Sequence, residues 1–94
     1  MDQEVFQNVW DAIEPSPAQA AGLKARSELL FALHEAIAGW DVTPADAARR
    51  LGLTPTRFDQ LRRGKIGAFS LDALVALATK AGLSVKVEAI SPAA

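Results

Sequence analysis

Hydrophobic residues recur at helical spacing between Ser16 and Gly39 of this chain. Leu30, Leu33 and Ile37 lie three or four residues apart, so they form one apolar stripe along a helix. Serine before proline is a common start of a helix, and glycine commonly ends one. The pattern therefore predicts a long helix that begins after Ser16 and stops before Gly39.

Two shorter helical patterns follow, and a tight turn separates them. Thr43 and Thr54 each precede a proline, the usual pairing of an N-cap with the first helical residue. Gly52 ends the first of these helices, because a left-handed backbone costs glycine little. The pattern predicts a helix-turn-helix over residues 43–64, the unit that places its second helix in the major groove of DNA. The alternative is an ordinary helical hairpin.

The charges of the chain are unevenly distributed and favour DNA binding over an ordinary hairpin. Residues 49–65 carry six basic side chains and one acidic one, which gives a net charge of +5. Residues 1–48 carry two basic and eight acidic side chains, a net charge of −6, and residues 66–94 balance. The total charge of −1 therefore hides a basic patch centred on the motif, as expected of a protein that reads DNA.

A further helix and a strand are predicted after the motif. Ser70 caps a helix with an apolar stripe, and Gly82 ends it. Residues 83–90 then alternate apolar and polar side chains, which is the period of a half-buried strand. No second strand of comparable length is predicted, so we expect this one to pair with its copy in a dimer or with the sheet edge of another protein.

The predicted fold is therefore mainly α: a bundle of four to five helices with a short C-terminal β-strand. Residues 1–15 carry apolar side chains at helical spacing, and we expect this arm to dock on its own domain or in a partner's groove. The predicted organisation is an apolar arm at 1–15, a DNA-binding domain at 16–82, a contact strand at 83–90 and a tail at 91–94.

The outward face of the second motif helix carries the residues expected to read DNA. Its outward line is Thr56, Gln60 and Arg63, whose side chains suit a thymine methyl group, adenine and guanine respectively. Asp59 beside them either accepts a hydrogen bond from cytosine or holds a neighbouring arginine in place. The residues expected to contact bases or phosphates are Arg49, Arg50, Thr54, Thr56, Arg57, Asp59, Gln60, Arg62, Arg63 and Lys65.

Apolar side chains outside the predicted core are candidates for contact with a second copy or a partner. Phe31 points away from the buried stripe of the long helix, and the apolar positions of the predicted strand need a surface to cover them. The residues expected at such a contact are Trp10, Phe31, Leu83, Val85, Val87 and Ala89.

Several function classes are excluded by what the sequence lacks. The chain has no cysteine, one histidine (His34) and no glycine-rich phosphate loop, so we expect no enzyme, no metal site and no cofactor. No apolar run approaches the roughly 18 residues of a membrane span. The acidic start differs from the basic start of a signal peptide, and we expect a soluble cytoplasmic protein.

The motif residues resemble those of the Xre/Cro-type helix-turn-helix family, which has a λ-repressor-like fold, and more narrowly those of the HigA-like antitoxins. The residues that carry the resemblance are Thr43, Ala47-Ala48, Leu51-Gly52-Leu53, Arg57-Phe58, Leu61, Arg63-Gly64-Lys65 and Phe69-Ser70-Leu71-Asp72, together with upstream Val9-Trp10-Asp11-Ala12-Ile13. The resemblance implies a homodimer that binds a palindromic operator in double-stranded DNA, often its own promoter, and masks a RelE/ParE-like ribonuclease toxin. A stand-alone Xre-type regulator without a toxin, and an interaction module that has lost DNA binding, are the alternatives.

The sequence departs from that family at positions that face DNA. Relatives commonly have glutamine where this chain has Pro44, serine where it has Asp59 and aspartate where it has Gln60. They also commonly have Ser-Gln-Pro in place of Thr54-Pro55-Thr56. The resemblance therefore implies an operator sequence that differs from those of relatives, on an unchanged scaffold.

Overall fold

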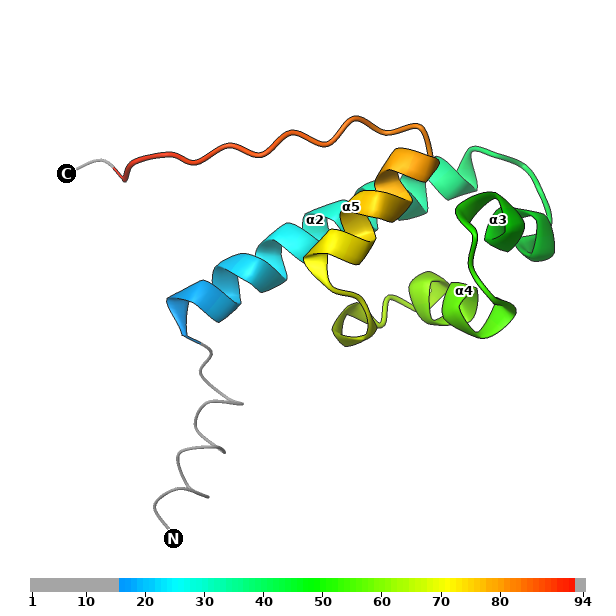
Figure 1. The fold of residues 1–94 in the computed structure, drawn as a ribbon, viewed down its shortest axis with the longest axis horizontal. Coiled ribbons are helices and arrows are strands. Elements are labelled where there is room, and N and C mark those ends of the chain that lie inside the picture. Colours follow the sequence, from blue (N-terminus) through cyan, green and yellow to red (C-terminus); the bar gives the residue numbers. More distant parts are fainter. Residues whose placement is uncertain (1–15, 93–94) are drawn as a thin grey trace, which may run out of the picture.

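The computed structural model describes residues 16–92, whose regular elements are all helical (Figure 1). They follow one another along the chain as α2 (Pro17–Ala38), α3 (Pro44–Leu51), α4 (Pro55–Arg62), the short 3-10 helix η1 (Ile66–Ala68) and α5 (Leu71–Lys80). The long helix α2 packs mainly against α5, and α3 and α4 lie together at the C-terminal half of α2. The predicted mainly α fold with four helices is confirmed for the described part of the chain.

Each of the four α-helices begins where the sequence places an N-cap. Ser16 and Gln19 bond reciprocally, with the Gln19 amide 3.1 Å from the Ser16 hydroxyl and the Ser16 amide 2.9 Å from the Gln19 side chain. The hydroxyls of Thr43, Thr54 and Ser70 each accept from the backbone amide three residues on, at 3.1–3.2 Å. These bonds satisfy amides that the helix itself leaves unpaired, which explains why the predicted boundaries agree with the structure.

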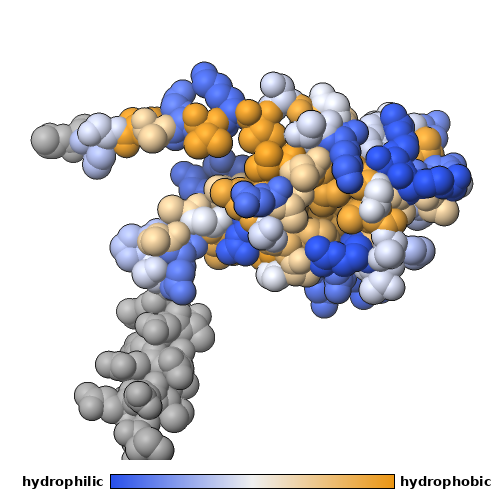
Figure 2. All heavy atoms as spheres, in the orientation of Figure 1, coloured by the Kyte–Doolittle hydropathy of each residue, from blue (hydrophilic) through white to orange (hydrophobic). Residues whose placement is uncertain are grey.

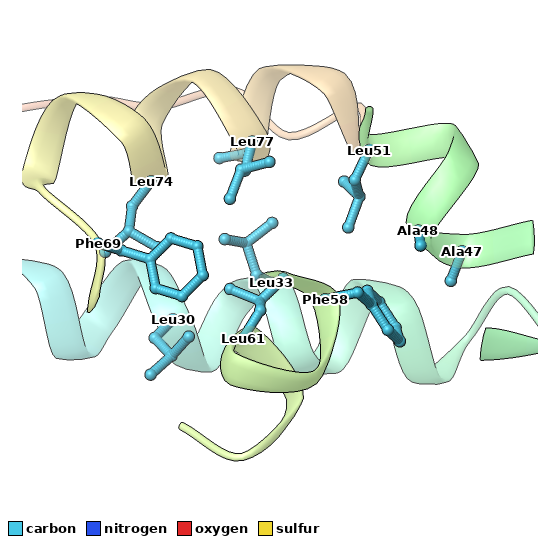
Figure 3. Close-up of a cluster of buried hydrophobic side chains, with 11 residues drawn as sticks. Leu30, Leu33, Ala47, Ala48, Leu51, Phe58, Leu61, Phe69, Leu74 and Leu77 are labelled. Atoms are coloured by element: carbon cyan, nitrogen blue, oxygen red, sulfur yellow. The ribbon is translucent and has the colours of Figure 1, made fainter. Parts of the chain in front are cut away.

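One apolar core joins the helices (Figure 3). Leu33, Leu51, Leu61 and Leu74 are fully buried and come from four different helices. The remaining buried core residues are Leu30, Ala47, Ala48, Phe58, Phe69, Leu77 and Ala78. Burial of a leucine side chain stabilises a fold by roughly 1.5–3 kcal/mol, so this shared core fixes α3 and α4 against α2 and α5.

Polar contacts that the sequence does not predict tie α2 and α5 to the motif. Nε2 of His34 in α2 lies 2.7 Å from the carbonyl oxygen of Leu61, near the end of α4. Nζ of Lys80 in α5 lies 3.5 Å from the carbonyl oxygen of Leu51, at the end of α3. Both partners are carbonyls in the last turn of a helix, which lack the usual donor amide four residues on within that helix; the carbonyl of Leu61 also accepts from the Gly64 amide at 3.1 Å. The two contacts therefore support the C-terminal ends of both motif helices.

The predicted C-terminal strand is not confirmed, because the structure has no strand within residues 16–92. Residues 83–92 instead form an extended segment that leaves α5 (Figure 1). Leu83 and Val85 pack against the core, whereas Val87 and Ile90 are 86% and 76% exposed. A strand is defined by hydrogen bonds to a neighbouring strand, and the described helical body presents no sheet edge. The side chains alternate as the sequence predicts, but the described part of one copy offers no strand for this segment to pair with.

Candidate DNA interface

The second motif helix, α4, is oriented by two buried side chains. Phe58 and Leu61 enter the core and are 6% and 0% exposed. Because successive residues of an α-helix turn by about 100°, Thr56 and Arg63 lie on the opposite side, and both are exposed. Gly52 sets the crossing of α3 and α4, since its φ of 68° is left-handed. The predicted outward line is thus open to solvent at these two positions.

Asp59 is the centre of an ion-pair cluster on the outer side of α4. Its Oδ1 lies 2.7 Å from Nη2 of Arg62, and its Oδ2 lies 2.9 Å from Nε of Arg63. Hydrogen bonds from Arg62 and then Arg63 hold the pKa of Asp59 below its ordinary value, so the carboxylate is ionised at neutral pH. Of the two roles considered for Asp59, the geometry favours holding the arginines, because both carboxylate oxygens are already engaged.

Arg57 is turned into the protein instead of toward solvent. Its Nη1 donates to the carbonyl oxygen of Ala68 at 2.8 Å and to Oε1 of Gln60 at 3.0 Å. Its guanidinium also lies 4.2 Å from the centre of the Phe69 ring, a cation–π distance. We therefore assign Arg57 a structural role, joining α4 to the loop around η1. Gln60 is partly buried, and its Oε1 must give up the bond from Arg57 before it can accept one from a base.

The predicted phosphate contacts differ in how freely their side chains can move. Lys65 is exposed in the loop after α4. Arg49 is 74% exposed and paired with Asp46 at 2.7 Å. The guanidinium of Arg50 lies 4.2 Å from the Trp40 ring, which holds it near the connection between α2 and α3. Thr54 is exposed, and its hydroxyl already serves as the cap of α4.

A groove of about 520 Å³ runs between α3 and α4. Its floor is apolar and includes Ala48, Leu53 and Phe58, and its edges carry Arg49 and Arg62. Positive side chains along a groove between the two motif helices would follow a phosphate backbone. The structure thus brings Arg49 of α3 and Arg62 of α4 to one groove, which Asp59 also lines.

The predicted partner-contact residues fall into separate places. Phe31 is 65% exposed on α2, as predicted. Leu83 and Val85 are partly buried, while Val87 and Ala89 are exposed on the extended segment. Trp10 and the rest of the arm 1–15 lie outside the described residues.

Three residues that position the site have no local signal in the sequence. Trp40, Phe69 and His34 act through contacts 10 to 27 residues away along the chain, which periodicity does not report. Trp40 packs against the core, and its ring also holds the guanidinium of Arg50. Only a three-dimensional arrangement reveals these pairings.

Two other classes of site were checked in the described part of the chain. Within residues 16–92, no group of three or more histidine, cysteine, aspartate or glutamate side chains could hold a metal ion. None of the described helices combines the length and apolar content that a bilayer crossing requires.

Comparison with known proteins agrees with this geometry. A family model described as a helix-turn-helix domain matches residues 12–90. A solved structure described as an XRE-family transcriptional regulator superposes with a TM-score of 0.72 and 26% sequence identity, over 79% of this chain and 83% of that one. The search of curated proteins gave no match. Since the family model spans most of the sequence, the chain belongs to the helix-turn-helix domain family and has an XRE-type fold.

Proposed function

We propose that this protein is a sequence-specific DNA-binding transcriptional regulator that reads the major groove with α4. The observation that carries the proposal is the open outer face of α4, where Thr56 and Arg63 are exposed within a stretch of net charge +5. An α-helix fits the major groove, and arginine can donate two hydrogen bonds to guanine. The role is one of binding, and no catalytic activity is assigned.

In the proposed complex, some contacts position the protein on the duplex and others recognise the base sequence. Arg49, Arg62 and Lys65 bind phosphates and set the register of the protein on the duplex. Thr56 and Arg63 reach base edges, and Gln60 joins them if it exchanges its bond from Arg57 for one from a base. Asp59 keeps the guanidinium of Arg63 on the outer face of the helix. Two copies on a palindromic operator would place two α4 helices one turn of DNA apart.

We further propose that the protein represses its own promoter as the antitoxin of a type II toxin–antitoxin module. The support is the resemblance of its motif to HigA-like antitoxins and the exposed Phe31, which is available for a partner such as a small RelE/ParE-like toxin. A stand-alone XRE-type regulator is the second candidate, supported by the structural neighbour of that type. Co-expression with the products of adjacent genes separates them: a small basic protein that co-purifies, and is lost with Phe31→Ser, supports the antitoxin role.

DNA binding is tested by gel shift with DNA from upstream of the gene. If each copy neutralises four to six phosphates, the slope of log affinity against log salt for a dimer should be about −7 to −11. Arg63→Ala should cost roughly 1–3 kcal/mol and relax one base position. Lys24→Ala is the matched control, because it removes an exposed positive charge in the first half of α2, outside the motif. A shallow slope without sequence preference would refute the proposal and leave an interaction module as the explanation.

A further inference from the structure

The side-chain amide of Gln60 is oriented by Arg57. Its Oε1 accepts a hydrogen bond from Nη1 of Arg57 at 3.0 Å. A guanidinium group carries donors only, so the amide atom that faces it must be the oxygen. The amide nitrogen, Nε2, therefore points away from Arg57 with both of its N–H groups. Nε2 has no acceptor among residues 16–92, and no buried side-chain nitrogen there lacks a partner, so Nε2 is open to solvent.

Arg57 is held at two further points and therefore gives Gln60 a firm support. Its Nη1 also donates to the carbonyl oxygen of Ala68 at 2.8 Å, and its guanidinium lies 4.2 Å from the centre of the Phe69 ring. Phe69 is 2% exposed and belongs to the core, where close packing restricts its movement. The core thus sets the orientation of the Gln60 amide through Arg57.

This orientation determines what Gln60 offers to a base. A glutamine that binds adenine uses both ends of its amide: the oxygen accepts from the N6 amino group, and the nitrogen donates to N7. The oxygen of Gln60 is already occupied. To free it would leave the partly buried guanidinium of Arg57 with one acceptor fewer, which is unfavourable for a charged group. Donation from Nε2 requires no such exchange.

We propose that Gln60 reads DNA as a hydrogen-bond donor alone and therefore selects guanine. In the major groove guanine presents two acceptors, N7 and O6, and thymine presents one, O4. Adenine and cytosine each present an amino group, which faces a donor unfavourably. Arg57 is then a positioning residue for base recognition, besides joining α4 to the loop around η1. The residue type of Gln60 alone would instead suggest adenine.

The surroundings of α4 favour recognition by hydrogen bonds. Figure 2 shows several hydrophilic side chains over the part of the molecule where α3 and α4 lie. On such a surface the pattern of donors and acceptors is what distinguishes one base from another. The inference rests on the proposed function, since it requires α4 to lie in the major groove. The bond between Arg57 and Gln60 is nevertheless measurable without DNA.

The first test measures the order of the Gln60 amide in the free protein by NMR relaxation of its side-chain nitrogen. In the original protein this amide should be nearly as ordered as the backbone of α4. Arg57→Met removes the donors but keeps a long side chain against Phe69, and the order parameter of Gln60 should then fall below about 0.6. Arg50→Met is the matched control, because the guanidinium of Arg50 also lies 4.2 Å from an aromatic ring, that of Trp40.

The second test measures base preference with a pool of duplexes whose central segment is randomised. The base pair that Gln60 reads is the one whose preference is lost in Gln60→Leu. At that pair the original protein should bind guanine roughly fivefold or more tightly than adenine. Arg57→Met should reverse this order, because the freed amide can then bind adenine with both ends. Arg50→Met should leave the order of the bases unchanged, since any loss of affinity that it causes applies to every duplex alike.

A third variant tests the inference even if Arg57→Met does not fold. Gln60→Lys supplies donors only and leaves Arg57 its bond to Ala68, so it should retain the preference for guanine. Its added positive charge strengthens binding to every duplex. The comparison is therefore made on the order of the bases and not on affinity.

Five results would overturn the inference. They are a mobile Gln60 amide in the original protein, no base pair that responds to Gln60→Leu, adenine preferred over guanine at the pair that responds, guanine still preferred in a folded Arg57→Met variant, and guanine preference lost in Gln60→Lys. A protein that selects no duplex from the pool would instead refute the proposed function, so the two failures are distinguishable.

Discussion

Replacement of Asp59 by asparagine tests how the protein would balance affinity against specificity. The carboxylate accepts from Arg62 at 2.7 Å and from Arg63 at 2.9 Å. Asparagine has nearly the same shape but no charge, so the two guanidinium groups lose their common anchor. Because all three side chains are substantially exposed, the fold should be almost unaffected.

The magnitude follows from the charge balance on α4. Loss of Asp59 removes one negative charge from the surface that faces DNA and lets the arginines neutralise about one more phosphate per copy. The salt slope of a dimer should therefore become steeper by about 1.8, and affinity for nonspecific DNA should increase. Arg63 would no longer be held at one base, so the ratio of specific to nonspecific affinity should fall roughly tenfold or more.

The assay measures binding to the operator and to a scrambled duplex across a salt series. Asp46→Asn is a matched control, because Asp46 pairs with Arg49 at the same 2.7 Å and the same spacing. It should also raise nonspecific affinity but leave the ratio unchanged. The reasoning fails if Asp59→Asn lowers the ratio of specific to nonspecific affinity equally in an Arg63→Ala background. It also fails if the loss of specificity is confined to one cytosine, which would show that Asp59 contacts that base directly.

Three further predictions concern the scaffold. Leu61→Ala, at a fully buried position of α4, should lower the free energy of unfolding by about 2–5 kcal/mol in urea titration. Gly52→Ala should destabilise by roughly 1–2 kcal/mol because its φ of 68° suits glycine, whereas Gly67→Ala has open space around the new methyl group and should be nearly neutral. Arg57→Ala should lower the melting temperature, through the lost bond to Ala68, and should leave the base preference set by Thr56 and Arg63 unchanged; a change at those positions with unchanged stability would contradict its structural role.

The sequence predicts the parts of this fold that depend on neighbours along the chain. Caps such as Thr43 and Thr54 act within one helical turn, and the stripe of Leu30 and Leu33 follows from helical periodicity. Both signals are local, so the helices and their starts could be read directly. The inward position of Phe58 follows from the same periodicity, which is why the open face of α4 was also predictable.

The parts that the sequence does not predict depend on contacts between distant segments. Helical spacing places Arg57 at the edge of the outer face. In the structure its guanidinium instead contacts the Phe69 ring and donates a hydrogen bond to the carbonyl oxygen of Ala68, eleven residues away. The predicted strand at 83–90 is not confirmed for a related reason. Alternating side chains indicate that one segment is extended, whereas a strand also needs a second segment to pair with. The ion pairs of Asp59 are predictable only in part. Its spacing to Arg62 and Arg63 allows either pair, and only the structure shows that both form together.

The helix proposed to bind DNA and the start of the extended segment after α5 are attached to the same apolar core. From α4 the chain passes the buried Phe69 and enters α5, where Leu74 and Leu77 are also buried. It leaves α5 at Gly82 and continues into the extended segment. Because Leu83 and Val85 pack against the same core as Phe58 and Leu61, the start of the extended segment and α4 hold a fixed orientation relative to each other. A contact that joins two copies through this helical body would therefore fix the angle and separation of two α4 helices, which is what a duplex with a regular helical repeat requires of a dimeric reader.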